Sequence, residues 1–197
     1  MVSEREAKRG RPRNDGIDAA VLGAVRRHLR EHGVAGVSVR AVAADAGTTR
    51  AAIYRRWPTT EALLVAAIAD LADRGGLEEG DDPLVDLEAE LRDFRTAIRA
   101  AGSVGLVGVM LSGEVTPSLR AEYRRRVVRP RRARIRRCLD RGVALGLLDP
   151  DADVEGAVAM ATGSWYGAVL AGPPPGRDWP RRTARLLWAA CGGGFAA

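Results

Sequence analysis

The sequence predicts an all-α fold in which a three-helix N-terminal module precedes a larger helical bundle. Three observations support this prediction. Alanine and leucine are abundant, aromatic residues make up only 5% of the chain, and β-branched runs are short, which favours helices over strands. Apolar residues recur at helical spacing through most of the 197 residues. Turn segments that contain glycine or proline separate these stretches and divide the chain into about nine helices.

The N-terminal part begins with a predicted flexible basic arm over residues 1–14, because this stretch is highly charged and contains a glycine and a proline. The next helix ends at Gly33, which suits a C-cap. Ser38 and Thr49 are N-cap residues for the two short helices that follow. We expect these three helices over residues 15–32, 39–46 and 50–57, and assign 15–59 to one domain.

The remaining residues, 60–197, are divided by signals that begin helices. Asp82-Pro83 and Thr116-Pro117 each place a capping side chain before a proline, and Asp149-Pro150 marks a turn. Residues 172–176, Gly-Pro-Pro-Pro-Gly, form a stiff connector. We expect helices over residues 60–74, 83–101, 104–111, 117–141, 152–170 and 179–191.

The positive charge of the chain is concentrated at one end. The net charge is +6. Residues 1–57 hold eleven arginines, one lysine and six acidic residues, whereas residues 58–197 hold nineteen arginines and nineteen acidic residues. A basic segment attracts phosphates and releases their counterions, so the N-terminal part is the expected nucleic-acid contact.

Residues 38–57 are the most informative segment of the sequence. They predict two short helices joined at Gly47, which permits the left-handed turn between them. This is the shape of a helix-turn-helix, whose second helix enters the major groove of double-stranded DNA. The alternative is a solvated basic helix without a partner.

The residue types in this segment suit DNA contact. Arg50 is long enough to bind a guanine through two hydrogen bonds, and Ala51 is small enough to approach a thymine methyl. Tyr54 and Arg55 are expected to contact phosphates of one DNA strand. Arg40 is expected to contact phosphates of the opposite DNA strand. The candidate DNA-binding residues are Arg40, Thr48, Thr49, Arg50, Ala51, Tyr54, Arg55, Thr59 and Thr60.

Short motifs here carry a family resemblance. They are Glu31-His32-Gly33, Ser38-Val39, Ala43-Ala44-Asp45-Ala46-Gly47, Thr49-Arg50, Ile53-Tyr54, Trp57-Pro58 and Glu61-Ala62-Leu63. Residues 17–66 therefore resemble the TetR family of bacterial transcriptional regulators, and the rest of the chain resembles it in architecture alone. Two positions depart from the family pattern: Trp57 replaces a more usual phenylalanine, and Thr60 replaces a lysine that often contacts phosphate. A threonine hydroxyl and the helix N-terminus would bind phosphate more weakly.

The resemblance implies a repressor that binds a two-half-site operator as a homodimer and is released by a small-molecule effector. It also implies that the bundle after residue 60 binds that effector. The candidate lining is mostly apolar, which favours a hydrophobic or aromatic effector. We expect no cofactor. For each of these positions, the alternative is ordinary core packing. For the bundle as a whole, the alternative is that it has no ligand pocket and that a protein partner controls the regulator. The candidate effector-binding residues are Phe94, Val107, Met110, Leu111, Tyr123, Met160, Trp165 and Tyr166.

The last two helices are the candidate dimer interface. Small residues in 152–170 allow two helices to approach closely, and 179–191 supplies apolar area. Two such pairs would form a four-helix interface. The candidate interface residues are Gly156, Ala159, Gly163, Gly167, Leu187 and Trp188.

Two patterns suggest other functions. His28-x-x-Glu31-His32 matches a zinc-hydrolase motif, with two histidines on one helix face and a glutamate as base, but no third ligand is evident. Residues 120–141 contain eleven arginines. We interpret this run as the exposed face of a helix, paired with Glu122, Asp140 and the acids of 83–101 (Asp86, Glu88, Glu90 and Asp93). The alternative is a second nucleic-acid surface.

Several classes of protein are not favoured. Cys138 and Cys191 are far apart and form neither a disulfide framework nor a zinc motif. No run of eighteen apolar residues is present, and residues 9–13 are not followed by the apolar core of a signal peptide. We therefore expect a cytoplasmic protein that does not contact membranes and is not an enzyme.

Overall fold

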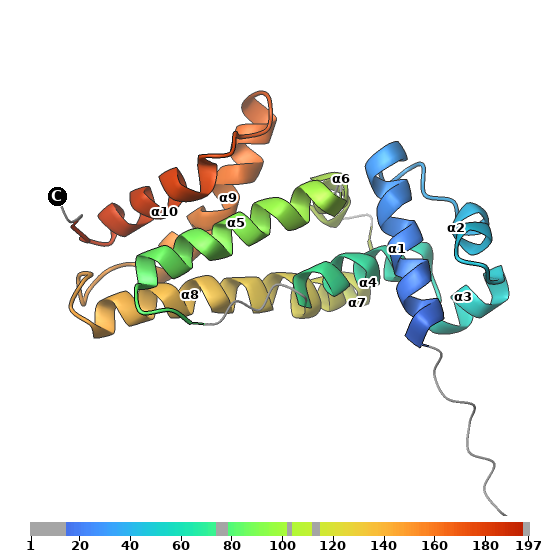
Figure 1. Cartoon of the computed structure of the whole chain (residues 1–197), viewed down its shortest axis with the longest axis horizontal. Coiled ribbons are helices and arrows are strands. Elements are labelled where there is room, and N and C mark those ends of the chain that lie inside the picture. Colours follow the sequence, from blue (N-terminus) through green and yellow to red (C-terminus); the bar gives the residue numbers. More distant parts are fainter. Residues whose placement is uncertain (1–14, 74–78, 102–103, 112–114, 195–197) are drawn as a thin grey trace, which may run out of the picture.

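The computed structural model describes residues 15–73, 79–101, 104–111 and 115–194, and all regular structure within these ranges is helical (Figure 1). The helices are α1 (Asp15–His32), α2 (Val39–Asp45), α3 (Arg50–Arg56), α4 (Thr60–Asp73), α5 (Pro83–Ala101), α6 (Val104–Leu111), α7 (Pro117–Tyr123), the π-helix η1 (Arg124–Val128), α8 (Arg129–Ala144), α9 (Val154–Ala171) and α10 (Trp179–Ala190). Because α7, η1 and α8 follow one another without a break, the described residues confirm the predicted nine helices and the all-α class. The predicted basic arm, 1–14, lies outside them.

Local signals in the sequence explain where most helices begin. The Thr49 Oγ1 accepts a hydrogen bond from the Ala52 N–H at 3.1 Å, and Thr116 caps α7 in the same way. Asp82 Oδ1 accepts the Leu84 N–H at 2.8 Å at the start of α5. Ser38 occupies the N-cap of α2, but its side chain forms no capping hydrogen bond, so the predicted cap is wrong in this detail.

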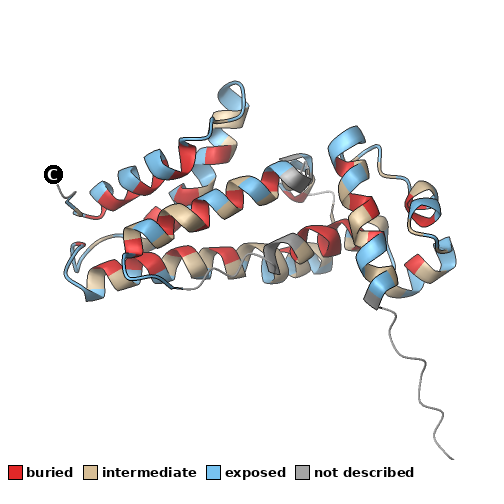
Figure 2. Ribbon diagram, in the orientation of Figure 1, coloured by how far each residue is buried: buried red, intermediate tan, exposed pale blue. Residues whose placement is uncertain are grey.

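Two hydrophobic cores organise the molecule, and buried residues follow the inner faces of the helices in each (Figure 2). The first lies among α1, α2, α3 and α4 and also includes Met110 and Tyr123. The second lies among α5, α8, α9 and α10. The predicted domain boundary at residue 59 falls inside the first core, because α4 contributes Leu63, Leu64 and Ile68 to it. The division into domains remains a prediction.

The arrangement places the two ends of the molecule in different environments. The α1–α3 module lies at one end of an elongated molecule, and α9 and α10 lie away from it (Figure 1). Helices α4, α6 and α7 lie between the module and the second core. Among the described residues, no helix has the length and apolar character needed to cross a membrane.

Candidate functional site

The first candidate surface is formed by the turn between α2 and α3. Gly47 has a φ of 61°, in the left-handed region that favours glycine, and the Thr48 N–H donates to the Ala43 carbonyl at 2.9 Å. Ile53 is buried against α1 and α2 and anchors the inner side of α3. This anchoring fixes which face of α3 points to solvent.

Most of the predicted DNA-binding residues are exposed on this part of the module. Thr48 and Thr60 are half-buried, and the exposed set is Arg40, Thr49, Arg50, Ala51, Tyr54, Arg55 and Thr59. Within the described chain, Arg40, Arg50 and Arg55 form no ion pair, so their charge is available to a phosphate or a base. Thr59 Oγ1 accepts the Ala62 N–H at 3.1 Å and therefore caps α4, which orients its hydroxyl. Contact of these residues with DNA remains a prediction.

Other charges of the module are used within the fold. Arg56 Nε lies 2.6 Å from Asp18 Oδ1, and Arg26 Nη1 lies 2.6 Å from Asp70 Oδ2. Asp45 Oδ2 lies 3.1 Å from His28 Nε2 and 3.2 Å from Arg27 Nη2. The hydrogen bond with His28 lowers the pKa of Asp45 below its usual value, and the hydrogen bond from Arg27 adds a smaller effect in the same direction.

These contacts bear on the zinc-hydrolase hypothesis. His28 forms a hydrogen bond with Asp45, and His32 is exposed beside Glu31. In the part of the chain that the structure describes, no group of three histidine, cysteine or acidic side chains is arranged to hold a metal ion. The motif therefore gains no support from the fold.

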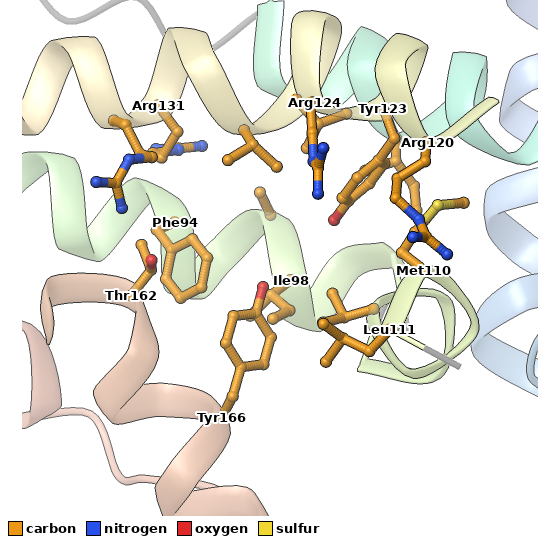
Figure 3. Close-up of a pocket in the computed structure, with 16 residues that line it drawn as sticks. Phe94, Ile98, Met110, Leu111, Arg120, Tyr123, Arg124, Arg131, Thr162 and Tyr166 are labelled. Atoms are coloured by element: carbon orange, nitrogen blue, oxygen red, sulfur yellow. The ribbon is translucent and has the colours of Figure 1, made fainter. Parts of the chain in front are cut away.

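The second candidate site is a partly open pocket of about 280 Å³ lined by residues of α4, α5, α6, α9 and the continuous α7–η1–α8 helix (Figure 3). A pocket is therefore present, contrary to the alternative of a region without one. Six of the eight predicted positions line it: Phe94, Val107, Met110, Leu111, Tyr123 and Tyr166. Binding by these residues remains a prediction.

Two predicted lining residues are wrong. Met160 is 54% exposed on the outer side of α9, and Trp165 is 1% exposed in the second core. The Trp165 ring lies 5.1 Å from Trp179 and 6.3 Å from Phe94, centroid to centroid. The pocket instead uses Thr162 and Tyr166, four residues apart on α9, because only one face of a helix meets the cavity.

The lining also has a polar part, which the apolar pattern of the sequence did not predict. Nine of the sixteen lining residues are apolar, as expected, but four are arginines from the arginine-rich run: Arg120, Arg124, Arg131 and Arg132. Their signal in the sequence was the spacing of arginines among Tyr123, Val127 and Val128, which brings charged and apolar residues onto one face.

The arginine run is only partly an exposed, paired face. Arg131 is buried, with Nη1 2.5 Å from Asp93 Oδ2 and 3.5 Å from Glu90 Oε2. Arg134 also pairs with Glu90, and Arg141 pairs with Asp86 at 2.6 Å. Glu122 and Asp140 pair within the run as predicted. The predicted role of Glu88 is wrong, since it pairs with Arg92 on its own helix.

The candidate dimer face is only partly placed as predicted. Ala159, Gly163 and Gly167 are exposed on α9, and Gly156 is half-buried. Leu187 and Trp188 are buried in the second core, so their assignment to a subunit interface is wrong. On the outer faces of α9 and α10, Leu170 is 89% and Leu186 is 68% exposed, so apolar area remains available there for a partner. The helical period fits either choice, and packing against α5 decides which face of α10 is inside.

Comparisons with known proteins place this arrangement in a family. The tetR family of bacterial regulatory proteins matches residues 21–67, and the tetracyclin repressor-like C-terminal domain matches residues 78–187. The uncharacterized HTH-type transcriptional regulator YdeS of Bacillus subtilis is 26% identical over 166 residues, which cover 84% of each chain. The crystal structure of the TetR family transcription regulator SCO0332 is 26% identical, has a TM-score of 0.68 and covers 88% of this chain and 97% of that chain. A TetR-family regulator from Rhodococcus sp. shares the fold at 19% identity, with a TM-score of 0.70 and coverage of 90% and 99%.

Proposed function

The chain belongs to the TetR family and is a transcriptional regulator with a helix-turn-helix DNA-binding domain, and we propose that it is a repressor released from its operator by a small effector in the α4–α9 pocket. The DNA contact is the exposed side of α3, with Arg50 reading a base and Tyr54 and Arg55 binding phosphates. The proposed role is regulatory, without catalytic activity, and is carried out in the cytoplasm.

The observation that carries this proposal is a wall shared by the pocket and the DNA-binding module. Ile68, Met110 and Tyr123 line the pocket and are also buried in the first core, which holds α1, α2 and α3 together. Helix α6, a second wall, lies so close to the module that a Cβ added at Gly105 would lie 3.3 Å from Val34 Cγ2. A ligand that moves α4 or α6 would therefore move the module too.

We propose that two subunits associate through α9 and α10. The exposed face of α9 carries small residues, and Met160, Leu170 and Leu186 supply exposed apolar area around it. A two-fold dimer would set the spacing between two α3 helices to match two half-sites one helical turn apart. A ligand that favours another spacing would lower DNA affinity by differential binding to the two states.

The proposal can be tested once an operator has been selected from random duplexes with the purified protein. Compounds that bind the protein would be titrated into the protein–operator complex while fluorescence anisotropy follows release. We expect an effector to lower operator affinity by about 5–150-fold, and operator DNA to weaken effector binding by the same factor. A compound that fills the pocket while the operator affinity stays constant would contradict release by an effector.

A further inference from the structure

We propose that the pocket takes an amphiphilic carboxylate, an anionic head joined to an apolar body, and that Arg120 and Arg124 bind the head. This inference rests on the proposed function in that it uses the same pocket. It differs from the hydrophobic or aromatic effector expected from the sequence, because the charges of the lining were not visible there.

Among the described residues, two of the four arginines in the lining are paired with acids, and two are not. Arg131 is neutralised by Asp93 and Glu90, and Arg132 pairs with Glu155. Arg120 and Arg124 have no ion pair within the described chain, and Nε of Arg120 is buried without a hydrogen-bond partner. The lining contains no aspartate or glutamate. Buried polar groups are normally hydrogen-bonded, so an unpaired buried guanidinium nitrogen is consistent with a missing acceptor.

Arg120 and Arg124 are placed so that both can contact one ligand head group. They are four residues apart, at the junction of α7 and η1, and Figure 3 shows both side chains extending from this helix toward the pocket. Like charges at this spacing repel each other on a helix. A carboxylate between them would remove the repulsion and accept hydrogen bonds from both guanidinium groups. The π-turn that begins at Arg124 adds support, since such turns are frequent at functional sites.

Two phenols complete the polar end of the pocket. The hydroxyl oxygens of Tyr123 and Tyr166 are directed toward the interior of the cavity (Figure 3). Burial raises the pKa of Tyr123 to about 12 and also raises the pKa of Tyr166 above its usual value. Both groups are therefore neutral hydrogen-bond donors at physiological pH. Two cations and two neutral donors suit an anion and disfavour a cationic ligand.

The remaining lining supplies the apolar contact. Phe94 and Ile98 of α5 and Val107, Met110 and Leu111 of α6 form much of the apolar lining. The volume of about 280 Å³ lies just below the range of about 300–1,000 Å³ that is typical of pockets for drug-sized ligands. The occupant is therefore a small carboxylate with one apolar chain or ring.

The test compares matched ligands that share an apolar body and differ in the head group, which is an anionic carboxylate or a neutral alcohol. Decanoate and decanol form one pair, and 4-phenylbutyrate and 4-phenylbutanol form another. Calorimetry would measure their binding to the wild type and to Arg120→Gln, Arg124→Gln, Arg124→Lys and Arg129→Gln. Arg129 is the matched control, because it is exposed at the start of α8, outside the pocket, and has no ion pair within the described residues.

We expect at least one carboxylate to bind more tightly than its alcohol. Each glutamine variant at Arg120 or Arg124 should weaken carboxylate binding by about 10–100-fold, the range for a hydrogen bond to a charged group, and leave alcohol binding unchanged. Arg124→Lys should restore part of the affinity, and Arg129→Gln should match the wild type. Circular dichroism would verify that each variant is folded.

Alcohols that bind as tightly as the carboxylates would overturn the inference, as would pocket variants that bind carboxylates like the wild type. Failure of all four compounds to bind would overturn it as well, while leaving operator binding through α3 unaffected. Anisotropy with operator DNA separates the two proposals. A carboxylate whose binding depends on Arg120 and Arg124 but which does not change operator affinity would support the proposed ligand class. It would contradict the proposed release of the protein from its operator.

Discussion

Arg55 and Arg56 are adjacent and chemically identical, yet the fold gives them different environments. Arg55 is exposed and has no ion pair in the described chain, whereas Arg56 pairs with Asp18 on α1 and donates to the Ala52 carbonyl. Arg56 therefore ties α3 to α1, and only Arg55 is available to a phosphate. The sequence alone does not distinguish them, because the difference depends on which face of α3 the buried Ile53 turns inward.

Arg50→Ala should weaken binding to the selected operator by about 1–3 kcal/mol and relax the preference at one base pair. The reason is the position of Arg50 in the first turn of α3, exposed and without an ion pair among the described residues. Quantitative footprinting on a set of single-base operator variants would measure both effects. Arg30→Ala, on the exposed end of α1, is the control and should leave both unchanged. An unaltered base preference in Arg50→Ala would contradict base reading.

Tyr54→Phe should weaken binding to specific and unrelated duplexes by a similar factor. A phosphate contact carries no base information, so the loss of the hydroxyl should cost about 0.5–1.5 kcal/mol on each duplex. Anisotropy titrations with operator and scrambled DNA at one salt concentration would compare the two losses. If the loss is confined to the operator, Tyr54 reads bases instead.

At the scale of elements, local signals predicted the positions of the helices well, but they predicted less well which face of each helix is buried. The caps at Thr49, Asp82 and Thr116 are short-range patterns, so the corresponding helices begin where expected. The π-turn from Arg124 to Val128 could not be predicted, because its residues suit an ordinary α-helix equally well. The period of α10 was clear, but which side faces inward depends on α5, which lies 78 or more residues earlier in the chain.

The prediction of the pocket lining was incomplete for the same reason. Six of the pocket positions follow from apolar and aromatic residues at helical spacing, whereas Trp165 and Met160 are turned away from the cavity by the rotation of α9. The four arginines were missed because an arginine-rich helix is normally a solvated face. Only the tertiary arrangement of α5 and α9 around α7–η1–α8 turns part of that face toward a cavity.

Gly142→Ala should lower the free energy of unfolding by about 1–3 kcal/mol, since overpacking a filled core has this cost. An added Cβ would lie 2.8 Å from both Leu148 Cδ1 and Trp188 Cη2. Gly108→Ala is the matched control, because its Cβ would meet nothing within 4 Å and alanine is the better helix former. Urea unfolding should show that this control is as stable as the wild type or more stable by up to about 1 kcal/mol. Equal stability of the two variants would contradict tight packing between α8 and α10.

At the scale of the whole molecule, charge and apolar surface lie in different places. The excess positive charge belongs to residues 1–57, whereas the exposed apolar side chains of α9 and α10 lie at the other end of the fold. In the proposed regulator, this separation would let one end attract DNA while the other associates with a second subunit. It also makes the two activities separable by mutation.

Gly163→Arg should convert the dimer to a monomer that remains folded. Nothing lies within 4 Å of a Cβ at Gly163, so the new side chain fits the isolated subunit, and any loss must come from contact with another subunit. A buried, unpaired charge costs several kcal/mol, so the dimer dissociation constant should rise by about a hundredfold or more.

Light scattering after size exclusion would measure the change in mass, and operator binding should fall with it. Ser118→Arg, which adds the same charge at an exposed position of α7, is the control and should remain dimeric. A wild type that is monomeric at micromolar concentration would contradict the two-half-site arrangement.

The candidate DNA-binding residues and the pocket lining have no residue in common, because the first set ends at Thr60 and the second begins at Ile68. What joins them is the buried layer of α1, α4 and α6. After gene duplication, one copy can therefore acquire a new operator through α3, or a new inducer through α7 and α9, without disturbing the other property. For the same reason, grafting a foreign pocket onto this module requires that the residues of the connecting layer be transplanted with it.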